Sequence, residues 1–219
     1  MSFSKRMSRI KPSGIRAVQK RIAGKSDMIS FAAGLPDPAL YPLEDLRKAA
    51  DTMLEKEGAT AFAYGLTKGY GPLLDYLTDR MNNREHVECT KENICILSGS
   101  QQGLGLAAMT FLDEGDVVIT ENPSYLGAIN AFRPYGAEFV GVDTDDDGIV
   151  IEDLERALEE NPKTKLIYVI PNFQNPTGKA WTLERRERFM EVVAKYDVAV
   201  VEDNPYGDLR FKGEPLPHL

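Results

Sequence analysis

Apolar and polar positions follow two different rhythms along the chain, and the change comes near residue 92. Before it, apolar residues recur every three or four positions over residues 43–57 and about 72–81, which predicts two amphipathic helices. Gly58 suits a stop after the first helix, and Pro72 suits the first turn of the second.

After residue 92, short β-rich runs alternate with helical stretches. The predicted strands are residues 94–97, 117–120, 138–142, 166–170 and 198–201. The predicted helices are residues 100–112, 124–132, 151–160 and 182–196. Such βαβ patterning predicts an α/β fold, a mainly parallel sheet with helices on both faces, preceded by an N-terminal arm.

Polar clusters come directly after four of the predicted strands, at residues 98–102, 121–125, 171–178 and 202–206. Asn, Pro, Gly and Asp are also common in turns for purely local reasons. In an open α/β sheet, however, ligands bind outside the carboxyl ends of the strands. The four clusters in this register therefore predict a ligand site at that edge.

Single residues in these clusters allow both a binding and a structural interpretation. Ser100 stands where a strand gives way to a helix, which makes an anion site or an ordinary N-cap. Asp203 ends an apolar strand, and a buried carboxylate there needs a protonated ring nitrogen or an arginine as its partner. Tyr125 and Tyr206 can stack on a planar ligand or pack, and Asn175 precedes a proline, which leaves its amide free to bond across a loop.

Composition narrows the class of protein. The 219 residues carry 26 basic and 34 acidic side chains, a net charge of -8, which argues against nucleic acid or an anionic membrane as partner. No apolar run approaches the roughly 18 residues of a membrane span. With two cysteines and two histidines, neither a disulfide framework nor a zinc cage is expected, and no metal site is predicted. These features predict a soluble, cytoplasmic protein.

Charge is concentrated at the start of the chain, where residues 1–25 hold eight basic side chains and no acid. This basic arm has apolar residues of its own with which to pack. An organellar transit peptide is the other interpretation of such a beginning.

Several motifs carry a resemblance when taken in order. Residues 99–104 read Gly-Ser-Gln-Gln-Gly-Leu, residues 122–125 Asn-Pro-Ser-Tyr, residues 171–178 Pro-Asn-Phe-Gln-Asn-Pro-Thr-Gly, and residues 202–206 Glu-Asp-Asn-Pro-Tyr. This series resembles the fold-type-I pyridoxal-phosphate aminotransferases of classes I and II. The segments at residues 31–38 and 62–65 are similar to N-terminal motifs of that family, and the 2-aminoadipate and kynurenine aminotransferases are the most similar subgroup.

The resemblance implies a function, a cofactor and roles for individual residues. The implied enzyme uses pyridoxal 5′-phosphate to transfer an amino group between an α-amino acid and a 2-oxo acid, as a homodimer with shared active sites. Residues 1–42 would form the arm and a substrate-side segment, and residues 43–219 part of the large cofactor-binding domain. The implied cofactor contacts are Ser100 and Gln101 with the phosphate, Tyr125 stacked on the ring, Asn175 and Tyr206 with the phenolic oxygen, Asp203 with the pyridinium nitrogen, and Tyr64 with the phosphate of a neighbouring subunit. Gly34 would lie beside the substrate carboxylate, and Arg16 would contact the substrate side chain or remain a solvated charge of the arm.

The family also requires a Schiff-base lysine that this chain does not show. In the family it follows the Glu-Asp-x-Pro-Tyr motif at a distance, whereas the chain reaches Leu219 with Lys212 as its one later lysine. A Ser-Phe-Ser-Lys sequence at residues 2–5 is similar to the missing motif but lies at the wrong end. We therefore expect an incomplete chain that lacks the C-terminal part and the small domain, and that is inactive alone.

Two other functions compete with this one. Residues 103–108 satisfy G-x-G-x-x-A after a strand, and Glu121 ends the next strand, as in an NAD(P)-binding oxidoreductase domain, although Gly103 falls inside the helix. A non-catalytic module with aminotransferase architecture would explain the absent lysine. Residues 143–148 copy the opening of a calcium loop, but Leu154 stands where the loop needs Glu, so we expect a solvated turn.

Overall fold

The computed structural model describes residues 2–12, 20–21, 34 and 36–219. They divide into two compact units, which are described separately: residues 1–10 with 71–219, and residues 11–70. The boundary that we predict after residue 42 stays a prediction.

A parallel four-stranded sheet organises the first unit, in the order β2-β1-β3-β4. Its strands are β1 (Val117–Asn122), β2 (Glu138–Asp143), β3 (Thr164–Val169) and β4 (Ala199–Glu202). All four were predicted to within three residues at each end. The order reverses beside β1, because β2 adds on one side of it while β3 and then β4 add on the other.

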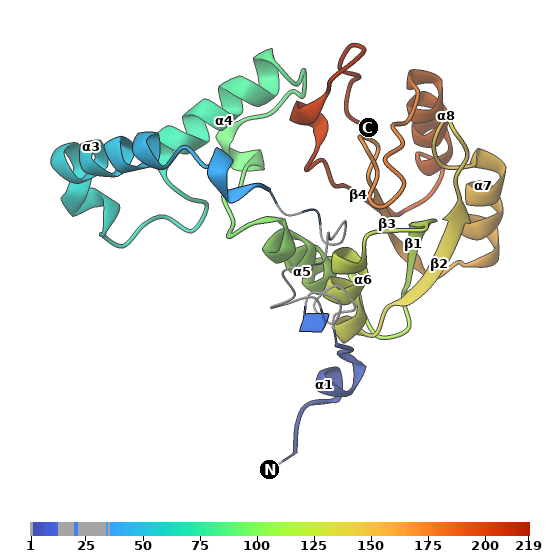
Figure 1. The fold of residues 1–219 in the computed structure, drawn as a ribbon. Helices are drawn as coiled ribbons and strands as arrows, with labels where there is room; N and C mark the ends of the chain where they lie inside the picture. Colours follow the sequence, from blue (N-terminus) through green and yellow to red (C-terminus); the bar gives the residue numbers. More distant parts are fainter. Residues whose placement is uncertain (1, 13–19, 22–33, 35) are drawn as a thin grey trace. The chain divides into compact units, whose positions relative to one another are not determined.

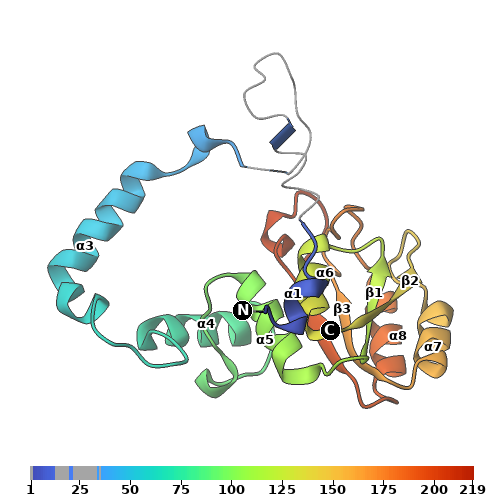
Figure 2. The same cartoon turned by 90° about the horizontal axis from the view of Figure 1, so that it is seen from below.

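Alternate residues of the strands face two separate cores. Ile119 and Ile167 pack with helices α7 and α8 in one core, whereas Val118 and Leu166 pack with α5 and α6 in the other. Figures 1 and 2 show these helix pairs on opposite sides of the sheet. The predicted α/β fold with helices on both faces is confirmed.

Five of the six described helices of this unit begin and end close to the predicted limits, and the short first one was not predicted. The six helices are α1 (Lys5–Arg9), α4 (Gly71–Asn83), α5 (Ser100–Phe111), α6 (Leu126–Phe132), α7 (Ile151–Glu160) and α8 (Leu183–Val193). Short 3₁₀ turns occur at Lys91–Asn93, Arg133–Tyr135 and Gly207–Leu209. Thr182 begins α8 by accepting a hydrogen bond from the Arg185 N–H.

One predicted strand, residues 94–97, is wrong. Ile94 has an extended backbone (φ −110°, ψ 138°), but no strand among the described residues pairs with this segment. A strand exists only through hydrogen bonds to a neighbour, so an apolar run without a neighbour remains extended chain.

The second unit contains α3 (Leu43–Ala61) and a 3₁₀ turn at Pro38–Leu40. The predicted stop at Gly58 is confirmed in part, because helical geometry breaks at this point but a further helical segment continues to Ala61. The irregularity falls one residue earlier, at Glu57 (φ −136°, ψ 15°), so the glycine follows a kink rather than an end. No residue of α3 is buried.

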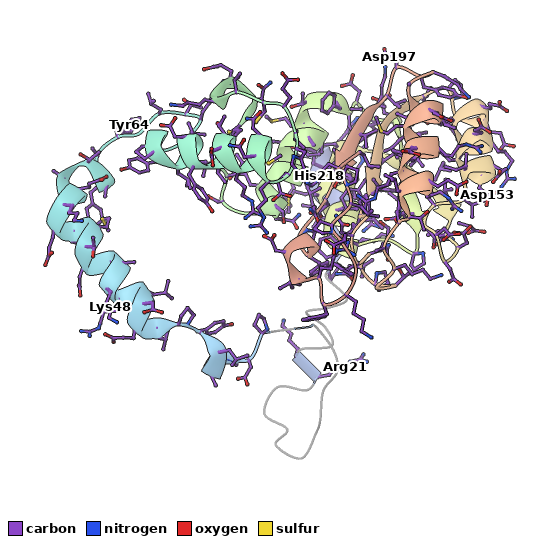
Figure 3. All side chains as sticks on the ribbon, turned by 90° about the horizontal axis from the view of Figure 1, so that it is seen from above. Arg21, Lys48, Tyr64, Asp153, Asp197 and His218 are labelled. Carbon is purple, nitrogen blue, oxygen red and sulfur yellow. The ribbon has the colours of Figure 1, made fainter. Side chains whose placement is uncertain are left out.

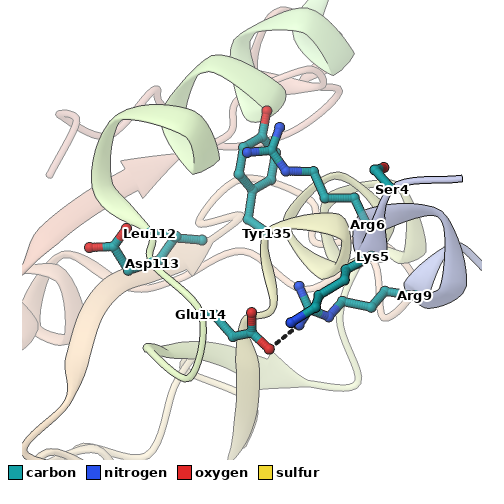
Figure 4. A pocket seen from close by; sticks show the side chains of 8 residues that line it. All are labelled: Ser4, Lys5, Arg6, Arg9, Leu112, Asp113, Glu114 and Tyr135. Atoms are coloured by element: carbon teal, nitrogen blue, oxygen red, sulfur yellow. Dashed lines mark hydrogen bonds and ion pairs between the residues drawn. The ribbon is translucent and has the colours of Figure 1, made fainter.

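The short helix α1 packs on the first unit beside the loop that leads into β1. Arg9 forms an ion pair with Glu114, and the Arg6 guanidinium lies 5.2 Å from the centre of the Tyr135 ring (Figure 4). A shallow cavity of about 420 Å³ lies between them. Among the described helices, none is both long and apolar enough to cross a membrane.

Candidate functional site

A small cavity of about 70 Å³ lies at the carboxyl edge of the sheet. Its lining comes from the start of α5 and from the segments after β1, β3 and β4: Ser100, Tyr125, Ile170, Asn175, Asp203, Pro205 and Tyr206. The sheet order reverses between β1 and β3, which is where open α/β sheets bind their ligands. Five predicted cofactor residues are therefore brought together at the predicted edge.

Asp203 is fixed in this cavity by strand pairing and by a buried phenol. Its backbone N–H donates to the Val169 carbonyl at 2.9 Å, which continues the β3–β4 ladder by one residue. The Tyr168 hydroxyl donates to Asp203 Oδ2 at 2.7 Å. Burial, followed by the nearby Asp203 carboxylate, raises the pKa of Tyr168, so the phenol keeps its proton and donates. The side chain of Asp203, which the sequence places at the end of a buried strand, is half-buried.

No ion pair among the described residues uses Asp203, which leaves the arginine partner considered above unsupported. The Tyr168 hydroxyl bonds to only one of the two carboxylate oxygens of Asp203, Oδ2. The carboxylate can therefore accept a further, cationic donor from the cavity.

Asn175 and Tyr206 form a second polar pair, in which Asn175 Nδ2 donates to the Tyr206 hydroxyl oxygen at 3.1 Å. The side chain of Gln174 stabilises the loop that carries Asn175 through hydrogen bonds inside it. The Gln174 Oε1 accepts from the Thr177 N–H (2.9 Å) and hydroxyl (2.8 Å), and its Nε2 donates to the Pro123 carbonyl at 2.8 Å. The loops after β1 and β3 are thus tied together beside the cavity.

Helix α5 presents its N-terminus to the cavity through Ser100. Gly99 precedes it with φ +83°, a left-handed conformation that favours glycine. The first N–H groups of a helix have no partner within it, and the helix dipole adds positive potential there. The Gln101 side chain does not line the cavity but donates to the Gly127 carbonyl at 3.2 Å, which ties α5 to α6.

Tyr125 lies just before α6, and its ring lies over Gly127. A Cβ atom at Gly127 would fall 2.3 Å from the ring, so only glycine leaves room for it. The sequence interpretation named Tyr125 but missed Gly127, whose role depends on where the ring lies.

The sequence interpretation also missed the structural role of Glu121, which lies near the end of β1. It is 1% exposed, and its two carboxylate oxygens accept from the Ile170 N–H and from Trp181 Nε1, both at 3.0 Å. Burial raises the pKa of Glu121 to about 7, and the hydrogen bonds oppose this shift. The available signal was a carboxylate directly after four apolar or small positions of a strand.

Three predicted residues lie elsewhere. Tyr64 and Gly34 belong to the second unit, where Tyr64 follows α3 with a fully exposed side chain (Figure 3) and Gly34 has φ +50°. Arg16 lies outside the described residues. The roles of these three residues stay predictions.

The geometry does not support the competing motifs. Gly103 is the fourth residue of α5 rather than part of the turn before it, and the Glu121 carboxylate is buried instead of free for a ribose. In the calcium-like segment, Asp145 accepts from the Asp147 and Gly148 N–H groups and pairs with Arg185. The described residues contain no cluster of three metal-binding side chains.

An open parallel sheet with a helix N-terminus, an aromatic ring and a carboxylate without an ion-pair partner among the described residues at one edge is typical of enzymes that bind a phosphorylated cofactor. The sequence profile described as aminotransferase class I and II matches residues 26–217. The chain belongs to the class I and II aminotransferase family.

Individual relatives agree with this assignment. The chain is 42% identical, over 98% of its length, to aromatic-amino-acid aminotransferase 1 of Thermococcus litoralis, of which it covers 52%. It matches the crystal structure of Pyrococcus horikoshii kynurenine aminotransferase in complex with PMP (TM-score 0.89, 39% identity, 97% of this chain, 53% of the other). It also matches α-aminoadipate aminotransferase of Thermus thermophilus complexed with N-(5′-phosphopyridoxyl)-L-leucine (TM-score 0.85, 39% identity, 98% and 52%).

The chain spans about half the length of these relatives. The resemblance to the aminotransferase family and to its aminoadipate and kynurenine subgroup is confirmed for the part of the protein that this chain represents.

Proposed function

We propose that the intact protein is a pyridoxal-phosphate-dependent aminotransferase that transfers an amino group between an α-amino acid and a 2-oxo acid by a ping-pong mechanism. Family membership supports the reaction class. The cavity supports the cofactor, because its groups match a flat, phosphorylated, cationic ring: main-chain donors at one side, an aromatic ring, and an acceptor carboxylate.

Each cavity residue has a role that its position supports. The N–H groups of Ser100 and Gln101 at the start of α5 would bind the phosphate, and the Tyr125 ring would stack on the pyridine. The amide of Asn175 and the hydroxyl of Tyr206 already form a pair, which would meet the phenolic oxygen together. A buried polar atom without a partner among the described residues, Ser124 Oγ, lies in the same loop as Tyr125 and is a further possible donor.

The observation that carries the proposal is the position of Asp203. Its carboxylate lines the same cavity as Ser100 and Asn175, and Tyr168 orients it through Oδ2. When bound, the cofactor supplies an electron sink for the charge that develops at the substrate Cα. Asp203 would hold the proton on the ring nitrogen, because an adjacent anion favours the protonated heterocycle. We assign no residue of this chain to proton transfer at Cα.

The names of the relatives guide the proposed substrate class, and the family resemblance guides the proposed assembly. The relatives named above act on aromatic amino acids, kynurenine and α-aminoadipate, so we propose an aromatic or dicarboxylic substrate. We propose a cytoplasmic homodimer in which Tyr64 reaches the phosphate in the other subunit, Gly34 lies beside the substrate carboxylate and Arg16 contacts the substrate side chain. The mass of the assembly in solution tests the dimer, and replacing Tyr64 by Phe tests the shared site through cofactor affinity.

Replacement of Asp203 by Ala in the intact protein tests the central proposal. We expect transamination to fall roughly 100-fold or more, the loss typical of removing one electrostatic group from an active site. Turnover is measured by formation of the 2-oxo acid, and the matched control is Asp197→Ala, an exposed acid before the other end of β4. Turnover near the wild-type rate in the Asp203 variant would refute the assignment.

A further inference from the structure

The loop of residues 171–180, between β3 and α8, carries Asn175 and begins and ends beside one buried carboxylate. Ile170 precedes the loop and lines the cavity, and Trp181 follows the loop. Glu121 Oε2 accepts from the Ile170 N–H and Oε1 from Trp181 Nε1, each at 3.0 Å. One side chain of β1 thus bridges both ends of a loop that belongs to β3.

Main-chain hydrogen bonds also join the two ends of this loop to each other. The Trp181 N–H donates to the Pro171 carbonyl at 2.8 Å, and the Gln174 N–H donates to the Lys179 carbonyl at 2.7 Å. These bonds join the loop to itself and therefore fix its shape. Glu121 joins both ends of the loop to the neighbouring strand, and together with the Gln174 bond to the Pro123 carbonyl it fixes where that shape sits relative to the cavity.

The bridge is isolated from water, which increases its effect on geometry. Ile170 and Trp181 are each 1% exposed, like Glu121 itself. A carboxylate that accepts from two donors in a dry environment cannot replace either bond with water, so losing one leaves a buried donor unpaired. The Gln174 side chain, within the same loop, also hydrogen-bonds this carboxylate and lowers its pKa.

We propose, resting on the proposed function, that Glu121 is a positioning residue of the cofactor site, whose carboxylate holds both ends of the 171–180 loop and thereby sets the position of Asn175. Glu121 does not line the cavity and acts through the loop and the two residues that flank it, Ile170 and Trp181. Its effect on cofactor binding therefore depends on Asn175 being present.

A double-mutant cycle in the intact protein tests this inference. Glu121→Gln keeps the volume of the side chain but presents an amide N–H₂ to one of the two N–H donors, which breaks one half of the bridge. The affinity of the cofactor-free protein for pyridoxamine 5′-phosphate, followed by fluorescence, is measured for the wild type, Glu121→Gln, Asn175→Ala and the double variant. This probe forms no covalent bond, so its affinity reports the non-covalent contacts.

We expect Glu121→Gln to weaken binding roughly ten-fold and to have almost no further effect when Asn175 is already Ala. The matched control is Thr164→Val, which removes a buried hydroxyl from the opposite end of β3 and should leave the affinity unchanged. Unchanged affinity in Glu121→Gln, or an equal loss in both backgrounds, would overturn the inference.

A second variant keeps the test available if Glu121→Gln fails to fold. Trp181→Phe keeps an aromatic ring but removes the Nε1 donor together with part of the indole, and the same cycle with Asn175→Ala applies with the same two outcomes. A wild-type protein that does not bind pyridoxamine 5′-phosphate would refute the proposed function itself. Normal wild-type binding with no coupling would refute only the positioning role.

Discussion

Tyr168 and Asp203 meet because of the register between two strands. Tyr168 pairs with Val201 in the ladder, and the Asp203 N–H bonds to the Val169 carbonyl, so the phenol reaches a carboxylate two residues beyond its own partner. The phenol faces the core formed with α5 and α6 and contacts the Phe132 ring edge-to-face. A single hydroxyl therefore connects this core to the cavity.

Replacing Tyr168 by Phe isolates the contribution of that hydroxyl. We expect kcat of the intact protein to fall about ten-fold with little change in KM, because a hydrogen bond to a charged group is lost while the ring stays packed. Steady-state kinetics give both constants. Tyr196→Phe, at a half-buried tyrosine that packs against the other core, is the control, and equal behaviour of the two variants would contradict the role of the Tyr168 hydroxyl.

The pKa of Glu121 predicts how stability depends on pH. Its pKa is about 7 in the folded protein, raised from an ordinary 4.5, so between these values the folded state binds more protons than the unfolded state. Stability should therefore fall as pH rises from about 4.5 to 7, by an amount on the order of 3 kcal/mol from this group. Urea unfolding at a series of pH values measures the slope, to which Tyr168 adds nothing because its phenol stays protonated.

The Glu121→Gln variant should lack this component of the slope, since an amide does not titrate. If the free energies of unfolding of the wild type and the variant differ by the same amount at every pH in this range, burial does not raise the pKa of Glu121 as described.

The residues of the site that the sequence revealed are those in turn motifs. Asn175, Asp203 and Tyr206 stand next to prolines or at strand ends, where local chemistry singles them out. Tyr168 and Glu121 lie within apolar strands, and their partners are set by which strand lies beside which. That pairing is a property of the assembled sheet, so no local pattern identifies it.

At the scale of elements, apolar periodicity predicted α7 at its observed limits and the four strands nearly so. It failed where the outcome depends on a neighbour. Residues 94–97 have a strand-like composition but no partner among the described strands.

Gly148, in the turn before α7, lies against Trp181, which follows the loop that carries Asn175. Gly148 has φ +128°, and a Cβ there would lie 2.6 Å from the Trp181 ring. Trp181 in turn donates to Glu121. The short hairpin around residues 144–149 is thus packed directly against one end of the Glu121 bridge.

We expect Gly148→Ala to destabilise the protein by roughly 2–4 kcal/mol, since backbone strain and displacement of a buried ring add together. Gly115→Ala is the matched control, because Gly115 also has positive φ (+89°) but has no atom within 4 Å of an added Cβ. It should cost about 1 kcal/mol. Urea denaturation compares the two, and equal losses would show that contact with Trp181 contributes nothing.

At the scale of the whole first unit, the fold class was predicted because it depends on element order, which the sequence displays. The edge that carries the site was predicted for the same reason, since parallel strands place all their carboxyl ends together. The two helix pairs cover the faces of the sheet, and the cavity lies where the start of α5 meets the loops after β1, β3 and β4.

The docking of α1 through Arg9 and Glu114 occurs at the amino ends of the strands, since Glu114 leads into β1. Six residues of strand separate that rim from the cavity, a span of roughly 20 Å. A fluorophore, affinity handle or solid support attached near Ser4 would therefore sit about a strand's length from the cavity, which makes α1 a convenient anchoring point for immobilised assays.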